Sequence, residues 1–408
     1  MSTSSLGVGM VGYAFMGRAH SQAWRTAGHF FDLPLNPRMA VICGRDQGKV
    51  ARAAQRLGWA AYETDWKRLV ARDDVQLVDV CTPGSSHAEI SVAALEAGKH
   101  VLCEKPLANT VAEARVMAEA AERAASQGVR AMVGFNFRRV PAVAFARELI
   151  AAGRLGAIRQ ARGVYLAAHA ADPETPLAWR FRAEEAGSGA LGDLGAHVVD
   201  LTQYLIGDHI TGVAALTETF TRERRLPSGG PAATMGSAGG PSGRGTVPPE
   251  PPSAGEGGPR GPVTVDDAAL FIARFTGGAT GSFEATRVAT GHHEGLRVEV
   301  NGEYGSLAWD LGRLNELHYY ATGEPATSGF RRIQVTRAEH PYAGAWWPDG
   351  HTIGYEHTFT HEIRDLLEAI AAGRDPVPSF ADGLQVQQVL DAVLRSAAAG
   401  SVWTEVHP

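Results

Sequence analysis

Short apolar segments alternate with helical segments over residues 6–134, and this alternation leaves few folds open. The apolar segments are Leu6–Val11, Met39–Cys43, Leu77–Cys81, His100–Cys103 and Val129–Gly134. Strands that alternate with helices form right-handed βαβ units, and consecutive units build a parallel sheet with helices on both faces. The sequence therefore predicts an α/β domain whose ligands bind at the carboxyl ends of the strands.

Two of the expected helices begin with capping-box sequences. Ser86 and Glu89 precede one amphipathic segment, and Thr110 and Glu113 precede another that runs to Gly128. In a capping box the hydroxyl and the carboxylate each accept a backbone N–H group at the start of the helix. Both helix starts are therefore predicted at these residues.

A glycine-rich turn follows the first expected strand. Gly7, Gly9 and Gly12 match G-x-G-x-x-G literally, but that frame places the turn inside the strand. Gly12, Ala14 and Gly17 fit a strand-turn-helix unit better, although alanine replaces the glycine that lets the backbone approach pyrophosphate. A glycine turn without a ligand is the plain alternative. The position of this turn at the start of the βαβ series favours a dinucleotide site, because backbone N–H groups and the positive end of a helix converge there.

The end of the second expected strand bears on the choice of dinucleotide. An acidic residue at this point bonds the ribose hydroxyl of NAD, and an arginine accommodates the phosphate of NADP. Here Gly44 occupies the expected acid position, with Arg45 and Asp46 beside it. Arg45 favours NADP, Asp46 leaves NAD open, and an arginine in a solvated turn is equally compatible.

Composition limits the remaining possibilities. A chain of 408 residues exceeds one ordinary hydrophobic core, so two domains are expected, at residues 1–134 and 135–408. The net charge of -6 gives no reason to expect a nucleic-acid partner. Three cysteines without a pairing pattern suit a cytoplasmic protein, and we find neither a signal peptide nor a membrane-spanning apolar segment.

Residues 135–408 show a different pattern, with short strands separated by glycine turns. This pattern predicts an α+β domain built on a large, mostly antiparallel sheet. Its clearest strands are Ile158–Leu166, Ala268–Phe275, Thr280–Arg287 and Leu296–Asn301. Between Pro227 and Pro262, 20 of 36 residues are glycine or proline, which predicts a disordered insertion between strands.

Four motifs in this order resemble the Gfo/Idh/MocA oxidoreductase family. They are Gly12–His20, Thr82-Pro83, Glu104-Lys105-Pro106 and Gly192–His197. The resemblance spans most of the chain, and E-K-P and D-x-x-x-H are its specific parts. It implies an N-terminal Rossmann domain, a C-terminal domain whose open sheet often mediates oligomerisation, and Lys105, Asp193 and His197 as the catalytic set.

The residue types of this set suit hydride transfer from an alcohol. The hydroxyl proton must go to a base, and a cation must stabilise the developing oxyanion. Asp193 and His197 lie one turn apart on an expected helix from Ala190 to Ile206, where Asp200 and Tyr204 continue the same polar stripe. An ordinary surface helix has the same pattern. Glycines at 187 and 189 favour a site, because glycine lets a ligand approach closely.

Further site residues are assigned partly from the strand ends and partly from the resemblance. The predicted cofactor-binding residues are Gly12, Tyr13, Ala14, Phe15, Met16, Gly44, Arg45, Thr82, Pro83, His87, Glu104 and Lys105. The predicted substrate-binding residues are Lys105, Asn136, Arg180, Asp193 and His197. No metal is predicted, since His357 and His361 lack a third ligand at a suitable spacing.

The resulting hypothesis is an NAD(P)-dependent oxidoreductase acting on a hydroxyl carbon of a sugar or of an inositol-like polyol. We expect a homo-oligomer, a dimer or tetramer. Two alternatives stay open: a non-catalytic dinucleotide-binding regulator, and a redox-assisted glycosidase that retains NAD.

Overall fold

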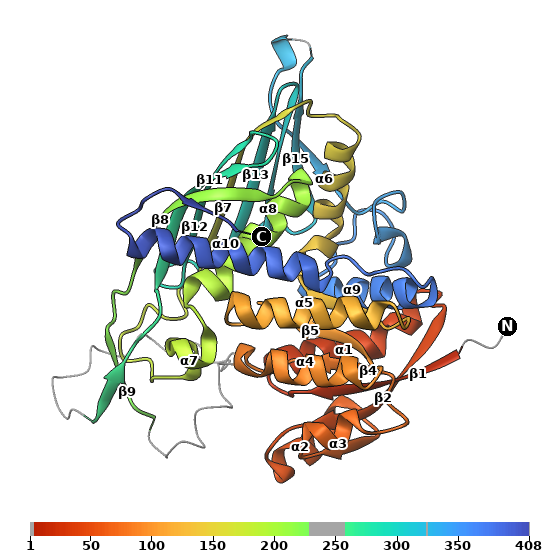
Figure 1. Cartoon of the computed structure of the whole chain (residues 1–408). Coiled ribbons are helices and arrows are strands. Elements are labelled where there is room, and N and C mark those ends of the chain that lie inside the picture. The colour runs from red at the N-terminus through yellow and green to blue at the C-terminus, as the bar shows by residue number, and fades with distance from the viewer. Residues whose placement is uncertain (1–3, 228–257, 324, 408) are drawn as a thin grey trace, which may run out of the picture.

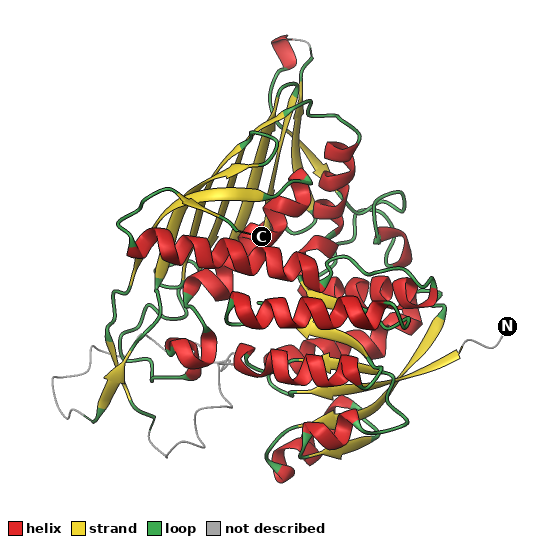
Figure 2. Cartoon of the chain, in the orientation of Figure 1, coloured by secondary structure: helices red, strands yellow, loops and turns green. Residues whose placement is uncertain are grey.

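The computed structural model describes residues 4–227, 258–323 and 325–407. It contains two main sheets (Figures 1 and 2). Among the described residues, no helix is both long enough and apolar enough to cross a lipid bilayer.

The first sheet has six parallel strands in the order β3-β2-β1-β4-β5-β6. The strands are β1 (Ser4–Val11), β2 (Leu35–Cys43), β3 (Ala61–Glu63), β4 (Leu77–Val80), β5 (His100–Glu104) and β6 (Ala131–Gly134). The intervening helices are α1 (Phe15–Phe30), α2 (Gln47–Leu57), α3 (Trp66–Val70), α4 (His87–Glu96) and α5 (Val111–Ala125). This strand order is that of a Rossmann fold. The chain adds strands on one side of β1 and then, from β4 onward, on its other side, and dinucleotides bind at the crevice between β1 and β4.

The second sheet has nine strands in the order β16-β15-β14-β13-β7-β12-β11-β8-β17. The strands are β7 (Ile158–Leu166), β8 (Ile210–Glu218), β11 (Ala268–Phe275), β12 (Thr280–Thr286), β13 (Gly295–Gly302), β14 (Gly305–Asp310), β15 (Glu316–Ala321), β16 (Arg331–Gln334) and β17 (Thr404–Glu405). All neighbours are antiparallel except β7 and β12. Burial alternates along β11 and β12, as expected where one face of a sheet packs and the other stays open. The predicted fold class is confirmed.

Five helices of residues 135–408 pack around the two sheets among the described residues. They are α6 (Pro141–Ala151), α7 (Ala183–Ala186), α8 (Ala196–Ile206), α9 (Tyr355–Ala371) and α10 (Phe380–Ala398). The helix α9 packs against α1, and α10 packs against both α5 and β8 (Figure 1). Phe359 and Ile363 of α9 share a buried cluster with Val8 and Met10 of β1. The domain division at residue 134 therefore stays a prediction, because part of the later segment completes the packing of the first sheet.

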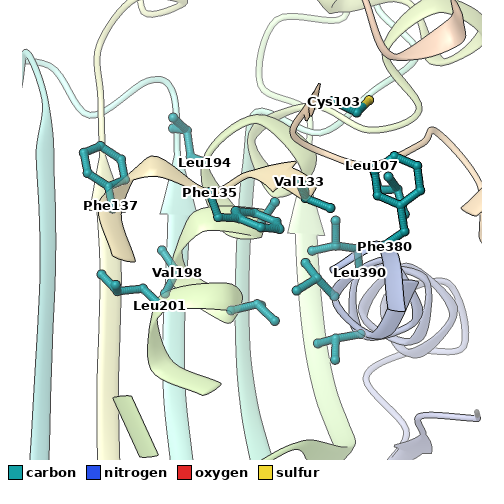
Figure 3. Packing of buried hydrophobic residues seen from close by; sticks show 14 of the residues in the cluster. Cys103, Leu107, Val133, Phe135, Phe137, Leu194, Val198, Leu201, Phe380 and Leu390 are labelled. Carbon is teal, nitrogen blue, oxygen red and sulfur yellow. The ribbon is translucent and has the colours of Figure 1, made fainter. Parts of the chain in front are cut away.

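A single apolar core fills the junction between the sheets (Figure 3). Phe135 follows β6, Leu194 lies in the turn before α8, Val198 lies in α8, and Phe380 and Leu390 come from α10. All five side chains are buried. Close packing of this kind fixes the two sheets relative to one another.

One local prediction was wrong, and the structure adds detail to two others. Ser86 makes no side-chain cap to α4 and bonds instead to Thr82 and to the carbonyl of Pro83, whereas the capping box at Thr110 is present. The helix expected from Ala190 begins as a π-helical segment, Leu191–Gly195, before α8. Most of the expected insertion, residues 228–257, lies outside the described residues, but β10 (Arg260–Pro262) pairs with β9 (Glu223–Arg225), so its end forms a strand.

Candidate active site

The glycine turn over residues 12–17, which we call the glycine cradle, is tightly packed at the carboxyl end of β1. Gly12 has a φ of 108°, and a Cβ atom there would lie 2.5 Å from the carbonyl oxygen of Cys81. A Cβ atom on Gly17 would lie 2.3 Å from the carbonyl oxygen of Gly12. Ala14 begins α1 without a side-chain cap, and the first turn carries no acidic residue. These features fit a dinucleotide, because the first N–H groups of α1 are left for an anion such as pyrophosphate.

The end of β2 lies beside this cradle. The Tyr13 ring covers Gly44 so closely that a Cβ atom on Gly44 would lie 2.0 Å from a ring carbon. The Asp46 carboxylate caps α2 by accepting the Lys49 N–H at 2.9 Å. Arg45 is exposed. The Tyr13 pKa is raised by burial and by Asp46, and the charge of Arg45 opposes this rise, so Arg45 lies within electrostatic range of the Tyr13 hydroxyl.

Thr82 and Pro83 follow β4 and are partly exposed beside Gly12. His87 is buried, with Nε2 2.8 Å from the Thr82 carbonyl and Nδ1 3.0 Å from the Pro106 carbonyl. Its ring therefore ties the loop after β4 to the loop after β5. Its contact with the cofactor stays a prediction.

Lys105 and Asp193 meet at the carboxyl end of β5. The Lys105 Nζ donates to the Asp193 main-chain oxygen at 2.7 Å and to Oδ1 at 3.2 Å. Burial would raise the Asp193 pKa, but the charges of Lys105, Arg180 and His169 outweigh it and hold this pKa well below its ordinary value. Asp193 is therefore an anion at neutral pH and holds the lysine head group in place.

His197 lies one turn further along the same segment. Its ring is buried, 4.8 Å from the Phe137 ring centroid and 6.0 Å from that of Tyr165. Burial and the charge of Lys105 hold the pKa of His197 well below its ordinary value, although Asp193 opposes this. Although Asp193 and His197 lie one turn apart, no hydrogen bond joins them among the described residues, since a π-helical turn changes the spacing along this helix face.

The polar stripe predicted on this helix divides after His197. Asp200 pairs with Arg138 within 3.0 Å, and Tyr204 lies against the same guanidinium. These two residues therefore belong to the packing around Arg138. Asn136 is buried and donates to the Thr358 hydroxyl at 2.8 Å, and its predicted contact with substrate is untested.

The glycines ahead of the helix have a structural cause. A Cβ atom on Gly187 would lie 2.8 Å from the Asn109 carbonyl oxygen, and one on Gly189 would lie 1.8 Å from the Asp266 carbonyl oxygen. The Asp266 carboxylate accepts the N–H groups of Gly189 and Leu191 at 2.7 and 2.8 Å. The backbone approaches other backbone here, so these glycines give no evidence for a ligand.

Three further side chains, which the sequence did not predict, surround Asp193. His169, three residues after β7, places Nε2 3.9 Å from Asp193 Oδ2 and is 40% exposed. Tyr165 bonds to Glu294, and burial raises the pKa of both groups, with Asp193 adding to each rise. The one available signal was the position of His169 just beyond a strand end. Arg180, which was predicted, lies over the Trp179 ring at 4.4 Å.

Two family matches cover most of the chain. Residues 6–135 match the oxidoreductase family with an NAD-binding Rossmann fold, and residues 143–308 match the GFO/IDH/MocA C-terminal domain. Levoglucosan dehydrogenase from Pseudarthrobacter phenanthrenivorans is 42% identical over 405 residues, which cover 98% of each protein.

Solved structures agree with these matches. An oxidoreductase domain protein from Kribbella flavida has a TM-score of 0.90 at 56% identity, covering 99% of this chain and 100% of that one. A levoglucosan dehydrogenase in complex with NADH and L-sorbose has a TM-score of 0.88 at 39% identity, covering 99% of each chain. These similarities confirm the predicted oxidoreductase class and the nicotinamide cofactor. The chain belongs to the Gfo/Idh/MocA family of NAD-binding oxidoreductases.

Proposed function

We propose that this protein is a dehydrogenase of an uncharged sugar, with the 1,6-anhydro sugar levoglucosan as the first candidate, and that Lys105, Asp193 and His197 are its catalytic residues. The observation that carries this proposal is the Lys105–Asp193 contact at the same sheet edge as the glycine cradle. Both features lie at strand ends, where a Rossmann fold brings cofactor and substrate together.

Each catalytic residue has a distinct task. A bound nicotinamide ring supplies the hydride acceptor. The Lys105 ammonium group holds the reacting oxygen and stabilises the negative charge that develops on it. Asp193 keeps Lys105 in place. His197 accepts the hydroxyl proton on a ring nitrogen, and its lowered pKa keeps the ring neutral before that step.

The charges around Asp193 favour an uncharged substrate. Asp193 forms an ion pair with Lys105, and Glu294 is a second acidic group close enough to interact with both. Arg287 is paired with Asp267 at 2.9 Å. Arg180 also acts on Asp193, so the described cations around this site are largely balanced by carboxylates, whereas a sugar phosphate is normally held by cations free to bind it. The identity to levoglucosan dehydrogenase supports the same substrate class.

We propose NAD(H) as the main cofactor, with NADP(H) as a weaker one. The NADH complexes of the related dehydrogenase support NAD(H). At the end of β2 the Asp46 carboxylate is engaged as a helix cap, and Arg45 is the exposed cation beside Tyr13. Arg45 gives the additional phosphate of NADP(H) a partner.

The test is turnover of a substrate panel. Purified protein is mixed with levoglucosan, glucose, myo-inositol or glucose 6-phosphate, with NAD or NADP, and the reduced nicotinamide is followed by absorbance. We expect the highest turnover with levoglucosan and NAD. Lys105→Met should lower kcat by about 100- to 1,000-fold, since one oxyanion-stabilising donor is worth that much. Normal turnover in this variant contradicts the assigned role.

The same experiment separates the two alternatives. A regulator binds NAD, seen as a rise in melting temperature, but reduces none of it with any member of the panel. A redox-assisted glycosidase releases a free sugar from a glycoside without net reduction of NAD. Either outcome replaces the dehydrogenase proposal.

We also propose a cytoplasmic homo-oligomer. Cys43, Cys81 and Cys103 are free and buried, which suits a reducing compartment. On the open face of the second sheet, Leu216 and Ile272 are each 57% exposed beside a groove of about 490 Å³. A second copy of this chain is the proposed cover for this apolar face.

A further inference from the structure

A buried charged cluster lies directly behind the Lys105 loop. His20 of α1 stands between Asp79 of β4 and Glu104, the last residue of β5. Its Nδ1 atom lies 3.0 Å from both carboxylate oxygens of Asp79, and its Nε2 atom lies 2.9 Å from Glu104 Oε1. The three residues are 1%, 0% and 4% exposed, so water does not weaken these contacts.

The hydrogen bonds determine where the protons are. Each ring nitrogen of His20 faces a carboxylate oxygen, and a ring that donates from both nitrogens is an imidazolium cation. Burial alone would lower the His20 pKa, but Asp79 holds it well above its ordinary value. Asp79 also accepts from Trp24 Nε1 at 2.7 Å and from Cys81 Sγ at 3.4 Å.

The same residues could be mistaken for a metal site. His20, Asp79 and Cys81 place their ligand atoms within 4.8 Å of one another. A metal needs a neutral imidazole and a thiolate. Here the imidazole is charged, and burial and Asp79 raise the Cys81 pKa well above its ordinary value, so the thiol keeps its proton. The cluster is therefore built from hydrogen-bond donors and acceptors.

The cluster connects to the catalytic lysine through Glu104. One oxygen of Glu104 accepts from His20, and the other accepts the backbone N–H of Lys105 at 3.1 Å. The Lys105 side chain then reaches Asp193. His20 thus holds the Glu104 carboxylate in place, and Glu104 in turn holds the backbone of Lys105.

We infer that His20 is a positioning residue for hydride transfer, acting through Glu104 on the location of Lys105. This inference rests on the proposed role of Lys105. A purely structural role, in which the ion pair only fastens α1 to the sheet, is the competing explanation. Buried ion pairs add little net stability compared with apolar residues of similar size, so fastening alone is a weak reason for such a cluster.

The test compares three variants under the same conditions. His20→Gln keeps the size of the side chain but loses the positive charge and one of the two opposed hydrogen bonds. Ser21→Ala is the matched control, because Ser21 is equally buried on α1 and bonds to Gly17 and Trp59 outside the cluster. Lys105→Met reports the role of the lysine itself. Active sites are counted by titration with NADH, followed by fluorescence.

We expect kcat per site to fall by about 100-fold in His20→Gln, since a displacement of about 1 Å in a catalytic group costs that much. The dissociation constant of NADH and the KM for the sugar should change by less than about threefold, and the primary deuterium isotope effect should rise. Ser21→Ala should keep its kcat. These results separate positioning from folding, because loss of folded protein lowers the number of sites and leaves kcat per site unchanged.

Two outcomes overturn the inference. One is a kcat per site in His20→Gln that matches wild type, and the other is an equal loss in Ser21→Ala. If Lys105→Met retains turnover, the proposed role of Lys105 fails first, and this inference fails with it. If His20→Gln does not fold, Asp79→Asn replaces it. That variant removes the charge that keeps His20 cationic, and the same fall in kcat per site is expected.

Discussion

At the scale of single residues, the partner of each side chain decides its charge at the site. Asp193 stays ionised because Lys105 and Arg180 face it, whereas His197 loses its proton because burial and the same lysine act together. His20 keeps a proton in an equally buried place because Asp79 faces it. For Asp193 and His20 the facing charge outweighs burial, whereas for His197 burial and the facing charge act in the same direction.

Arg45 should control the use of NADP. We expect Arg45→Ala to raise the KM for NADP by about 10- to 100-fold and to leave the KM for NAD nearly unchanged, because a hydrogen bond to a charged group contributes about 1.5 to 3 kcal/mol. Steady-state kinetics with both cofactors measure this. Arg52→Ala is the control, since Arg52 also lies near Tyr13 but on α2. An equal rise for NAD and NADP in Arg45→Ala would contradict the assignment.

Glu362 should make stability depend on pH. It is buried, neither oxygen has a hydrogen-bond partner among the described residues, and burial raises its pKa from 4.5 to about 8. Because the pKa of Glu362 is higher in the folded than in the unfolded state, this residue does not lower the free energy of unfolding below about pH 4.5. As the pH rises from there toward 8, the free energy of unfolding falls.

Glu362→Gln should remove this dependence. The variant should gain melting temperature relative to wild type between pH 5 and pH 8, by roughly several degrees at the upper end. Calorimetry across this range measures the difference. Glu368→Gln is the control, because Glu368 lies on the same helix and is paired with Arg364. If the melting temperatures of Glu362→Gln and wild type changed in parallel with pH, the pKa of Glu362 would not be raised in the folded protein, and the prediction would be wrong.

At the scale of elements, helix starts show what local sequence does and does not determine. The capping box at Thr110 forms because the residue has extended backbone and Glu113 is in reach. Ser86 has the same sequence pattern, but a short 3-10 turn at Gly84–Ser86 leaves its backbone outside the extended region. The preceding turn therefore decides whether a capping sequence is used.

Thr110→Ala should destabilise α5. We expect a loss of about 1 kcal/mol in the free energy of unfolding, since the Glu113 N–H loses its acceptor. Denaturant unfolding measures this loss. Thr110→Ser keeps the hydroxyl and should retain most of the stability. If alanine and serine cost the same, the cap contributes nothing.

The helices and strands could largely be predicted from the sequence, but the surfaces that they pack against could not. Hydrophobic periodicity located β7 and β11 at the observed bounds, because burial of one sheet face imposes a period of two residues. Periodicity says nothing about which surface covers that face, so the packing of α9 on α1 was missed. Lys105 and Asp193 came from motifs, whereas His169 and the role of His20 depend on contacts between residues far apart in the chain.

At the scale of the whole molecule, the two sheets differ in how many of their faces are covered by helices. The first sheet is covered by helices on both faces, as parallel sheets generally are. The second has helices on one face, and the other face presents Leu216 opposite Leu270 on the paired strands β8 and β11. Exposed apolar pairs on neighbouring strands make this face the best candidate for contact between copies of the chain.

Charging this face should separate the copies. We expect wild type to sediment as a dimer or tetramer, and Leu270→Glu combined with Ile272→Glu to sediment as a monomer, because each buried carboxylate would lack a partner in the interface. Both positions are exposed in the single chain, so the fold should tolerate the change. Val116→Glu is the control, since Val116 is 51% exposed on α5 and away from the second sheet. A monomeric wild type, or a double variant that stays assembled, would remove the open sheet as the oligomer interface.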